Sequence, residues 1–176
     1  MLGFIRKQCV TRICAPKNLP FPLLHSSLPK KPEMACSASL FSGPGSEELR
    51  RKGCSVCSKD TPKVPNEGLP KLLAAIPSWS LVDDKKAISR KFVAKNFKAA
   101  IDFINKAADV AEAESHHPDL HVTNYREVEV KVSTHAAGGL TDFDFILAAK
   151  LDEIPVDYSP KWLEKAQAAL QQTNKE

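Results

Sequence analysis

The stretch Glu112-Ala-Glu-Ser-His-His-Pro118, with the run Tyr125 to His135 that follows it, decides the fold of this chain. A helical pattern ends at the His-His-Pro step and an alternating pattern begins after it, so the chain passes here from helix to sheet. Three of the five histidines, His116, His117 and His135, lie in this stretch. Because an imidazole changes its charge near neutral pH, we expect the chemical centre of the protein here.

The helix before the histidine pair is predicted from an apolar stripe. Apolar side chains recur every three or four residues from Phe97 onward, and Asn96 is a good N-cap residue. We expect the helix to end near Ser115, because Pro118 disfavours helical backbone at the residue before it. Both adjacent histidines would then lie at the C-terminal end of the helix, where partly negative carbonyls favour a protonated imidazole.

The run after the histidine pair alternates between apolar and polar residues. The valines of Val128–Val132 would face the core, and His135 would lie on the opposite face. Gly138-Gly139 predicts a turn, and Thr141–Asp144 is typical of a capping box that opens another helix. A helix end and a strand end can therefore bring imidazoles to the rim of one cleft.

Other elements are predicted on both sides of this unit. We expect a helix over 67–76, a hairpin with strands over 79–82 and 87–95, a helix from Asp142 to about Glu153, and a helix from Ser159 to about Gln172. Strands that alternate in polarity, together with amphipathic helices, favour an antiparallel sheet with helices on one side.

The spacing of the histidines resembles that of a known family. The sequence reads Glu112, three residues, His116-His117-Pro118, six residues, Tyr125, nine residues, His135, eight residues and Asp144. This pattern is similar to that of the pterin-4a-carbinolamine dehydratases, also called dimerisation cofactors of a homeodomain transcription factor, in their plant-type organellar form. Trp79, Phe92 and the run 97–103 agree as well, so the resemblance covers about residues 66 to 155. Ser115 departs from it, since an acidic residue is common there.

The resemblance implies both a fold and a reaction. The fold is α+β, a four-stranded antiparallel sheet with three helices packed on one face. The fourth strand would lie weakly around 119–122 or come from a division of the first hairpin, and the C-terminal helical extension lies outside the resemblance. The reaction is dehydration of 4a-hydroxytetrahydropterin to quinonoid dihydropterin, with no metal and no organic cofactor. It needs one proton delivered to the leaving hydroxyl and one removed from the neighbouring ring nitrogen. We expect His116 and His135 to act as the acid/base pair and His117 to orient the pterin.

The remaining residues of the pattern have structural as well as functional interpretations. Glu112, one helical turn before His116, would orient that imidazole or remain a solvated helix acid. Asp144 would support the site, although its place in the capping box already explains it. Pro118 and Tyr125 would line the pterin cleft, with Tyr125 alternatively filling the sheet edge. Ser133 and Thr134 would offer backbone groups to the pterin.

Two other functions compete with catalysis. One is a noncatalytic dimerisation or assembly scaffold on the same fold, since family members form dimers or tetramers; we expect a homo-oligomer in either case. The other is a metal site of the three histidines, or zinc or redox chemistry at Cys54-x-x-Cys57. A structural zinc site needs four ligands, and no second cysteine pair follows Cys57.

Composition bounds the class of protein. With 43% hydrophobic and 26% charged residues the chain is typical of a globular protein, and no apolar run approaches the ~20 residues that span a bilayer. The net charge of +4 comes mostly from residues 1–32, which hold six Lys and Arg and no acid, so we expect no nucleic-acid partner and no membrane partner.

The first part of the chain has the composition of a targeting segment. Residues 1–32 are basic and acid-free, which favours a transit peptide, mitochondrial rather than plastid, over a secretory signal or an ordinary tail. Residues 33–65 are rich in Pro, Ser and Gly and are expected to form a flexible linker that carries the Cys-x-x-Cys pair. The predicted domain then occupies 66–155 and the helical extension 156–176.

Overall fold

The computed structural model describes residues 42–54 and 58–173, with side chains described as far as Ala169. The chain divides into two units, residues 1–34 and 35–176. The predicted transit peptide and Cys57 lie outside the described residues. No helix in the described part of the chain is long and apolar enough to cross a bilayer.

A four-stranded antiparallel sheet forms the centre of the domain. Its strands are β1 (Ser80–Val82), β2 (Ala87–Val93), β3 (Asp119–Thr123) and β4 (Glu127–Val132), in the spatial order β1-β2-β4-β3. The fourth strand, predicted weakly from the residues after Pro118, is confirmed as β3. The strand predicted to reach His135 is shorter, because β4 ends at Val132.

The sheet has one apolar face and one polar face, as alternation predicts. Ile88, Phe92, Val128, Val130 and Val132 are all at most 2% exposed and face the core. The neighbouring residues of β4, such as Glu129 and Lys131, point to the other face. Helices therefore have to cover only one side of the sheet.

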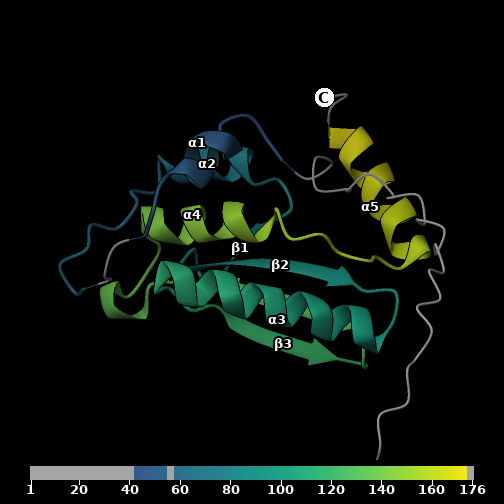
Figure 1. Ribbon diagram of the computed structural model, residues 1–176. Helices are drawn as coiled ribbons and strands as arrows, with labels where there is room; N and C mark the ends of the chain where they lie inside the picture. Colours follow the sequence, from purple (N-terminus) through teal and green to yellow (C-terminus); the bar gives the residue numbers. More distant parts are fainter. Residues whose placement is uncertain (1–41, 55–57, 174–176) are drawn as a thin grey trace, which may run out of the picture. The chain divides into compact units, whose positions relative to one another are not determined.

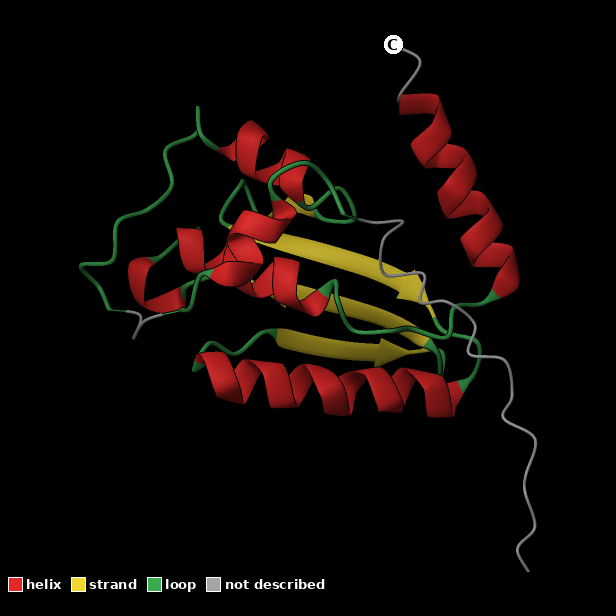
Figure 2. Ribbon diagram, turned by 45° about the horizontal axis from the view of Figure 1, so that its top comes forward, coloured by secondary structure: helices red, strands yellow, loops and turns green. Residues whose placement is uncertain are grey.

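Two helices cover the apolar face directly. They are α3 (Phe97–Glu114), capped by the Asn96 side chain, which accepts a hydrogen bond from the Ala99 N–H at 2.9 Å, and α4 (Asp142–Leu151). Figure 1 shows them side by side in front of the strands, and Figure 2 shows them on the same side of the sheet after rotation. Both helices confirm the predicted elements.

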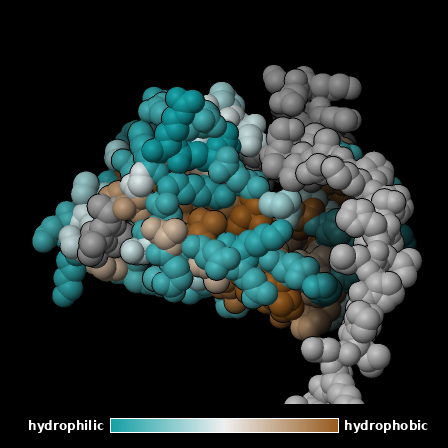
Figure 3. All heavy atoms as spheres, viewed as in Figure 1, coloured by the Kyte–Doolittle hydropathy of each residue, from teal (hydrophilic) through white to brown (hydrophobic). Residues whose placement is uncertain are grey.

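Helix α4 is apolar on nearly all sides because two further helices pack on it. These are α1 (Ser46–Arg51) and α2 (Leu69–Ala75), and α2 confirms the predicted first helix with ends one to two residues shorter. In Figure 3 hydrophilic residues cover α1 and α2, and hydrophobic residues appear below them where α4 lies. A helix packed on more than one side has no polar face to present to water.

Helix α1 corrects one expectation. Residues 46–51 were expected in a flexible linker, but they form a helix that contacts α4 and buries Leu49 to 6% exposure. The single apolar side chain of Leu49 is too weak a signal for a helix in a polar sequence. Contact with α4 supplies the burial that the local sequence lacks.

The predicted C-terminal helix is present as α5 (Pro160–Thr173). Its first turn is joined to the sheet by aromatic side chains, since Trp162 stacks on Tyr158 with ring centroids 4.9 Å apart. Both rings form T-shaped pairs with the ring of Phe92 in β2. The extension therefore begins as a packed part of the domain.

Candidate active site

The segments that carry the histidines meet at one end of the β3–β4 hairpin. Asp119 at the start of β3 pairs with Lys131 near the end of β4, and the two strands are antiparallel. Residues just before Asp119 therefore lie beside residues just after Lys131. In Figure 1 the end of α3 and the start of α4 both lie at the left, at the end of the sheet where β3 begins.

The end of α3 fixes the backbone of His116. Ser115 adopts a left-handed conformation with φ 50°, and its N–H donates to the Glu112 carbonyl oxygen at 3.2 Å. The His116 N–H donates to the Ala111 carbonyl oxygen, also at 3.2 Å. These two bonds form a Schellman motif, which reverses the chain direction and turns His116 back toward the core.

The side chain of His116 is buried against Asp144. Its exposure is 5%, and its Nε2 lies 2.9 Å from Asp144 Oδ1. A carboxylate accepts but does not donate, so this contact places a proton on Nε2 of the imidazole. Asp144 therefore fixes which tautomer a neutral His116 adopts.

Asp144 also connects three segments of the chain. Its Oδ2 accepts hydrogen bonds from the Thr141 N–H at 2.7 Å, from Thr134 Oγ1 at 3.0 Å and from Thr141 Oγ1 at 3.2 Å. The capping box of α4 is thereby confirmed. Asp144 is fully buried, and its charge faces the positive end of the helix dipole. One carboxylate thus holds the end of α3, the segment after β4 and the start of α4 together.

His117 lies on the outside of the same turn. Its side chain is 62% exposed, and its Nε2 lies 3.2 Å from Glu112 Oε1. This contact corrects the expectation that Glu112 would pair with His116. The left-handed residue Ser115 changes the direction of the chain, so the next imidazole along the sequence faces Glu112.

His135 begins a short 3₁₀ helix, His135–Ala137 (η2), and is exposed. It does not continue the polar face of β4, because the strand ends three residues earlier. Thr134, directly before it, is 2% exposed and bonds to Asp144. The His116–Asp144–Thr134 chain of hydrogen bonds therefore joins the two histidine-bearing segments.

Two residues expected to contact the pterin have other positions. Tyr125 is 61% exposed in the turn between β3 and β4, at the far end of β3 from the histidines, about 13 Å along the strand. It is therefore not at the rim of this site. The backbone of Thr134 is used within its own turn, since its carbonyl oxygen accepts from the N–H groups of Ala137 and Gly138. Pro118 and Ser133 are half-buried.

Cys54 lies beside the site from the side of α1. Its N–H donates to Glu114 Oε2 at 2.9 Å, and its Sγ lies 3.6 Å from the Phe143 carbonyl oxygen. Glu114 is further paired with Lys150 of α4 at 2.5 Å. Within residues 42–54 and 58–173, no three side chains of His, Cys, Asp or Glu are grouped so that they could hold a metal ion.

Sequence reasoning missed part of this network. Thr141 was named only as a cap and Asp144 only as a support. In the structure Asp144 contacts both His116 and Thr134, and Thr141 contacts Thr134. The one available signal was the capping box itself, because a cap fixes a carboxylate at the start of a helix. The partner of that carboxylate lies 28 residues away and follows only from the fold.

Comparison with known proteins agrees with this architecture. The family described as pterin 4 alpha carbinolamine dehydratase matches residues 62–154. The mitochondrial pterin-4-alpha-carbinolamine dehydratase 2 of Arabidopsis thaliana is 39% identical over 113 residues, 62% of this chain and 60% of that protein. A putative pterin-4-alpha-carbinolamine dehydratase of Rubrobacter xylanophilus is 37% identical over 107 residues, 61% of this chain and 98% of that protein.

Among solved structures, a transcriptional coactivator/pterin dehydratase from Brucella melitensis is 33% identical, with a TM-score of 0.49. The match covers 52% of this chain and 96% of that protein. Helix α5 lies beyond the residues that the family match includes.

Proposed function

This chain belongs to the pterin-4a-carbinolamine dehydratase family, and on that premise we propose that it dehydrates 4a-hydroxytetrahydropterin to quinonoid dihydropterin. In this reaction the bond between C4a and the hydroxyl oxygen breaks, and the oxygen leaves as water after it accepts a proton. The neighbouring ring nitrogen loses its proton, and its electrons form the new carbon–nitrogen double bond. The protein has to deliver one proton and remove another.

We assign this exchange of protons to His116 and His135, and the orientation of the pterin to His117. The observation that carries the assignment is the contact between His116 and Asp144 at the end of the hairpin that also bears His135. A histidine oriented by a buried carboxylate is suited to proton transfer, because its tautomer is fixed before the substrate binds. Each positioned proton transfer contributes roughly 10² to 10⁴ in rate.

Other residues have supporting roles in this proposal. Asp144 is a positioning residue that acts through His116, and Thr134 and Thr141 hold its second oxygen. Glu112 lies next to His117 and would steady the positive charge of that imidazole. Neither metal nor organic cofactor enters the reaction as written, since each step only moves a proton or breaks the bond to the leaving oxygen.

The direct test is a stopped-flow assay with chemically generated 4a-hydroxytetrahydropterin and the purified chain. We expect dehydration faster than in buffer alone, in proportion to enzyme concentration. A rate equal to that of buffer would instead favour a noncatalytic scaffold on the same fold. Metal analysis of the same preparation tests the other alternative, that the protein has a metal-dependent activity.

We also propose import into mitochondria and assembly into a dimer or tetramer. Import is supported by the acid-free basic composition of residues 1–32 and by a mitochondrial relative. N-terminal sequencing of the mature protein tests it, and an intact Met1 would contradict it. Light scattering during gel filtration gives the oligomeric state, and a monomer at cellular concentrations would contradict the assembly.

A further inference from the structure

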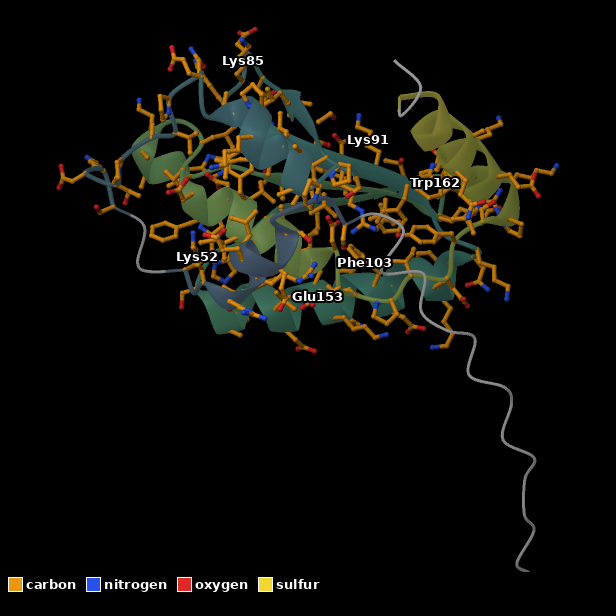
Figure 4. The ribbon with its side chains drawn as sticks, turned by 90° about the horizontal axis from the view of Figure 1, so that it is seen from above. Lys52, Lys85, Lys91, Phe103, Glu153 and Trp162 are labelled. Atoms are coloured by element: carbon orange, nitrogen blue, oxygen red, sulfur yellow. The ribbon has the colours of Figure 1, made fainter. Side chains whose placement is uncertain are left out.

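A cavity of about 200 Å³ lies between the sheet and α5, apart from the histidines. Its lining includes Pro77, Ser78, Arg90, Lys91, Trp162 and Ala166. Figure 4 labels Lys91 on β2 and Trp162 on α5, and the two side chains come from opposite walls. Because α5 lies outside the family match, one wall of this cavity comes from residues beyond that match and the other from residues within it.

The cavity exists because β1 is shorter than β2. The ladder between the two strands starts at the pair Ser80 and Ser89, so the later residues of β2 have no β1 neighbour. Further along β2, Ser159 pairs with the open edge of the strand, since its N–H donates to the Val93 carbonyl oxygen at 2.8 Å. Lys91 lies in the gap between these two contacts.

The backbone of Lys91 points into this gap. The backbone N–H and C=O groups of every second residue point to the same side of a strand. The carbonyl of Val93, two residues after Lys91, points away from β4, so the backbone groups of Lys91 do as well. The N–H of Ala94, by contrast, donates toward the β4 side, to the Arg126 carbonyl oxygen at 2.9 Å. The β1 ladder has ended at Ser89, and no described residue outside the strands bonds to the N–H and C=O of Lys91. The cavity therefore offers one backbone donor and one backbone acceptor.

Arg90 supplies fixed donors at the inner wall. The residue is 3% exposed; its Nη1 donates to Asp152 Oδ1 at 2.8 Å and its Nη2 to Tyr158 Oη at 2.5 Å. A weaker contact joins Nη1 to the Leu151 carbonyl oxygen at 3.5 Å. A guanidinium carries five N–H groups, so the Nε–H and one Nη2–H have no acceptor in the described part of the chain.

The charges around the cavity favour an anion. Arg90 and Lys91 line it, and none of the described residues in its lining is acidic. Asp152 lies behind Arg90 and offsets its charge in part. The Lys91 side chain is 69% exposed and lies on the opposite face of β2 from Arg90, where it pairs with Glu129 at 3.2 Å. The donor that Lys91 offers beside Arg90 is therefore its backbone N–H.

The other walls suit a flat ring. The indole of Trp162 is held by stacking on Tyr158, with an angle of 21° between the ring planes. Pro77 and the small side chain of Ala166 complete an apolar surface. An empty cavity of about 150 Å³ is known to bind benzene, so 200 Å³ accommodates one aromatic ring with a small substituent.

We propose that this cavity binds a small aromatic carboxylate, with the ring against Trp162 and the carboxylate on the donors of Arg90 and Lys91. The site is separate from the histidines and does not depend on the dehydratase reaction. It makes α5 a ligand-binding addition to the family domain.

The test is a titration of the full chain with benzoate, followed by NMR at the Trp162 indole N–H and the Lys91 amide. Benzamide keeps the ring without the charge, and acetate keeps the charge without the ring. We expect benzoate to bind at least ten times more tightly than either. Equal affinity for benzoate and benzamide, or no shift at these two resonances, would overturn the proposal.

Two variants localise the binding without touching the buried Arg90. Ala166→Phe fills the cavity and should weaken benzoate binding at least tenfold, while Lys165→Ala, exposed on the same helix, should leave it unchanged. The NMR spectrum of Ala166→Phe shows whether the domain stays folded. Wild-type affinity in folded Ala166→Phe would contradict the proposed position of the ligand. Should this variant unfold, Lys91→Pro replaces it, because proline removes the N–H donor at this edge of β2, with the same expected loss and the same contradiction.

Discussion

The Nε2 atom of His116 lies 2.9 Å from Oδ1 of Asp144, and the other oxygen of that carboxylate caps α4. The cap and the imidazole contact use different oxygens, so the structural role of Asp144 does not compete with a role at the site. The start of α4 thereby fixes the orientation of His116. Substitution of the carboxylate should affect both stability and proton transfer.

Asp144→Asn tests the control of the His116 tautomer. An amide at this place can donate to Nε2, which would move the imidazole proton to Nδ1. We expect kcat for pterin dehydration to fall by about 10² or more, with KM changed little, because the wrong tautomer is held in place. The pH profile of kcat should shift as well.

Asp142→Asn is the matched control, since it changes an exposed carboxylate in the same turn of α4. Activity and pH profile should stay those of the wild type. If folded Asp144→Asn also kept full activity, the orientation of His116 by this carboxylate would not contribute to the rate, and the prediction would be wrong.

His135→Ala removes the exposed imidazole at the start of η2. We expect a loss of about 10² to 10⁴ in kcat with little change in stability, because the side chain is on the surface. His121→Ala on β3 removes an equally exposed imidazole from the sheet and should be neutral. Equal rates for the two variants would exclude His135 from proton transfer.

Ser115→Gly tests the end of α3. Ser115 has φ 50°, a conformation that glycine adopts without the strain of a side chain. We expect the free energy of unfolding to rise by about 0.5 to 1 kcal/mol, measured by chemical denaturation. Ala113→Gly, in the last turn of the same helix, should lower it by a similar amount. Destabilisation by both changes would argue against the left-handed turn before His116.

Glu114→Gln tests the ion pair between α3 and α4. Burial raises the pKa of Glu114, but hydrogen bonds from Lys150 and the Cys54 N–H outweigh it and bring the pKa below its ordinary value of 4.5. A lowered pKa in the folded state stabilises the protein fully above about pH 4.5, and this contribution is lost as the pH falls through the lowered value.

We therefore expect Glu114→Gln to be less stable than the wild type by about 1 to 2 kcal/mol at pH 7, with a smaller difference near pH 3. Denaturation curves at both pH values measure it. Asp109→Asn, which changes an exposed carboxylate on the same helix as Glu114, serves as the control. A difference that grew toward low pH would contradict the direction of the shift.

Local patterns predicted the elements whose signal lies within a few residues. The N-cap Asn96, the alternation of Val128 to Val132 and the capping box at Thr141 each act through neighbours in sequence, and each is confirmed. These elements alone bring both histidine-bearing segments to one end of the hairpin. The placement of the site was therefore predictable before its contacts were.

The contacts themselves depend on the tertiary fold. Arg90 stands in β2 where alternation calls for an apolar side chain, and its partner Asp152 lies 62 residues away. Glu112 pairs with His117 because Ser115 adopts a left-handed conformation, which its residue type does not predict. Tyr125 fits the spacing of the family pattern, yet strand length puts it at the opposite end of β3.

The most direct test of the account is single-turnover dehydration by the variant His116→Ala/His135→Ala, compared with the wild type and with each single variant. The account predicts that each single variant keeps part of the acceleration and that the folded double variant reacts at the rate of buffer. A double variant that dehydrates 4a-hydroxytetrahydropterin as fast as the wild type would contradict it.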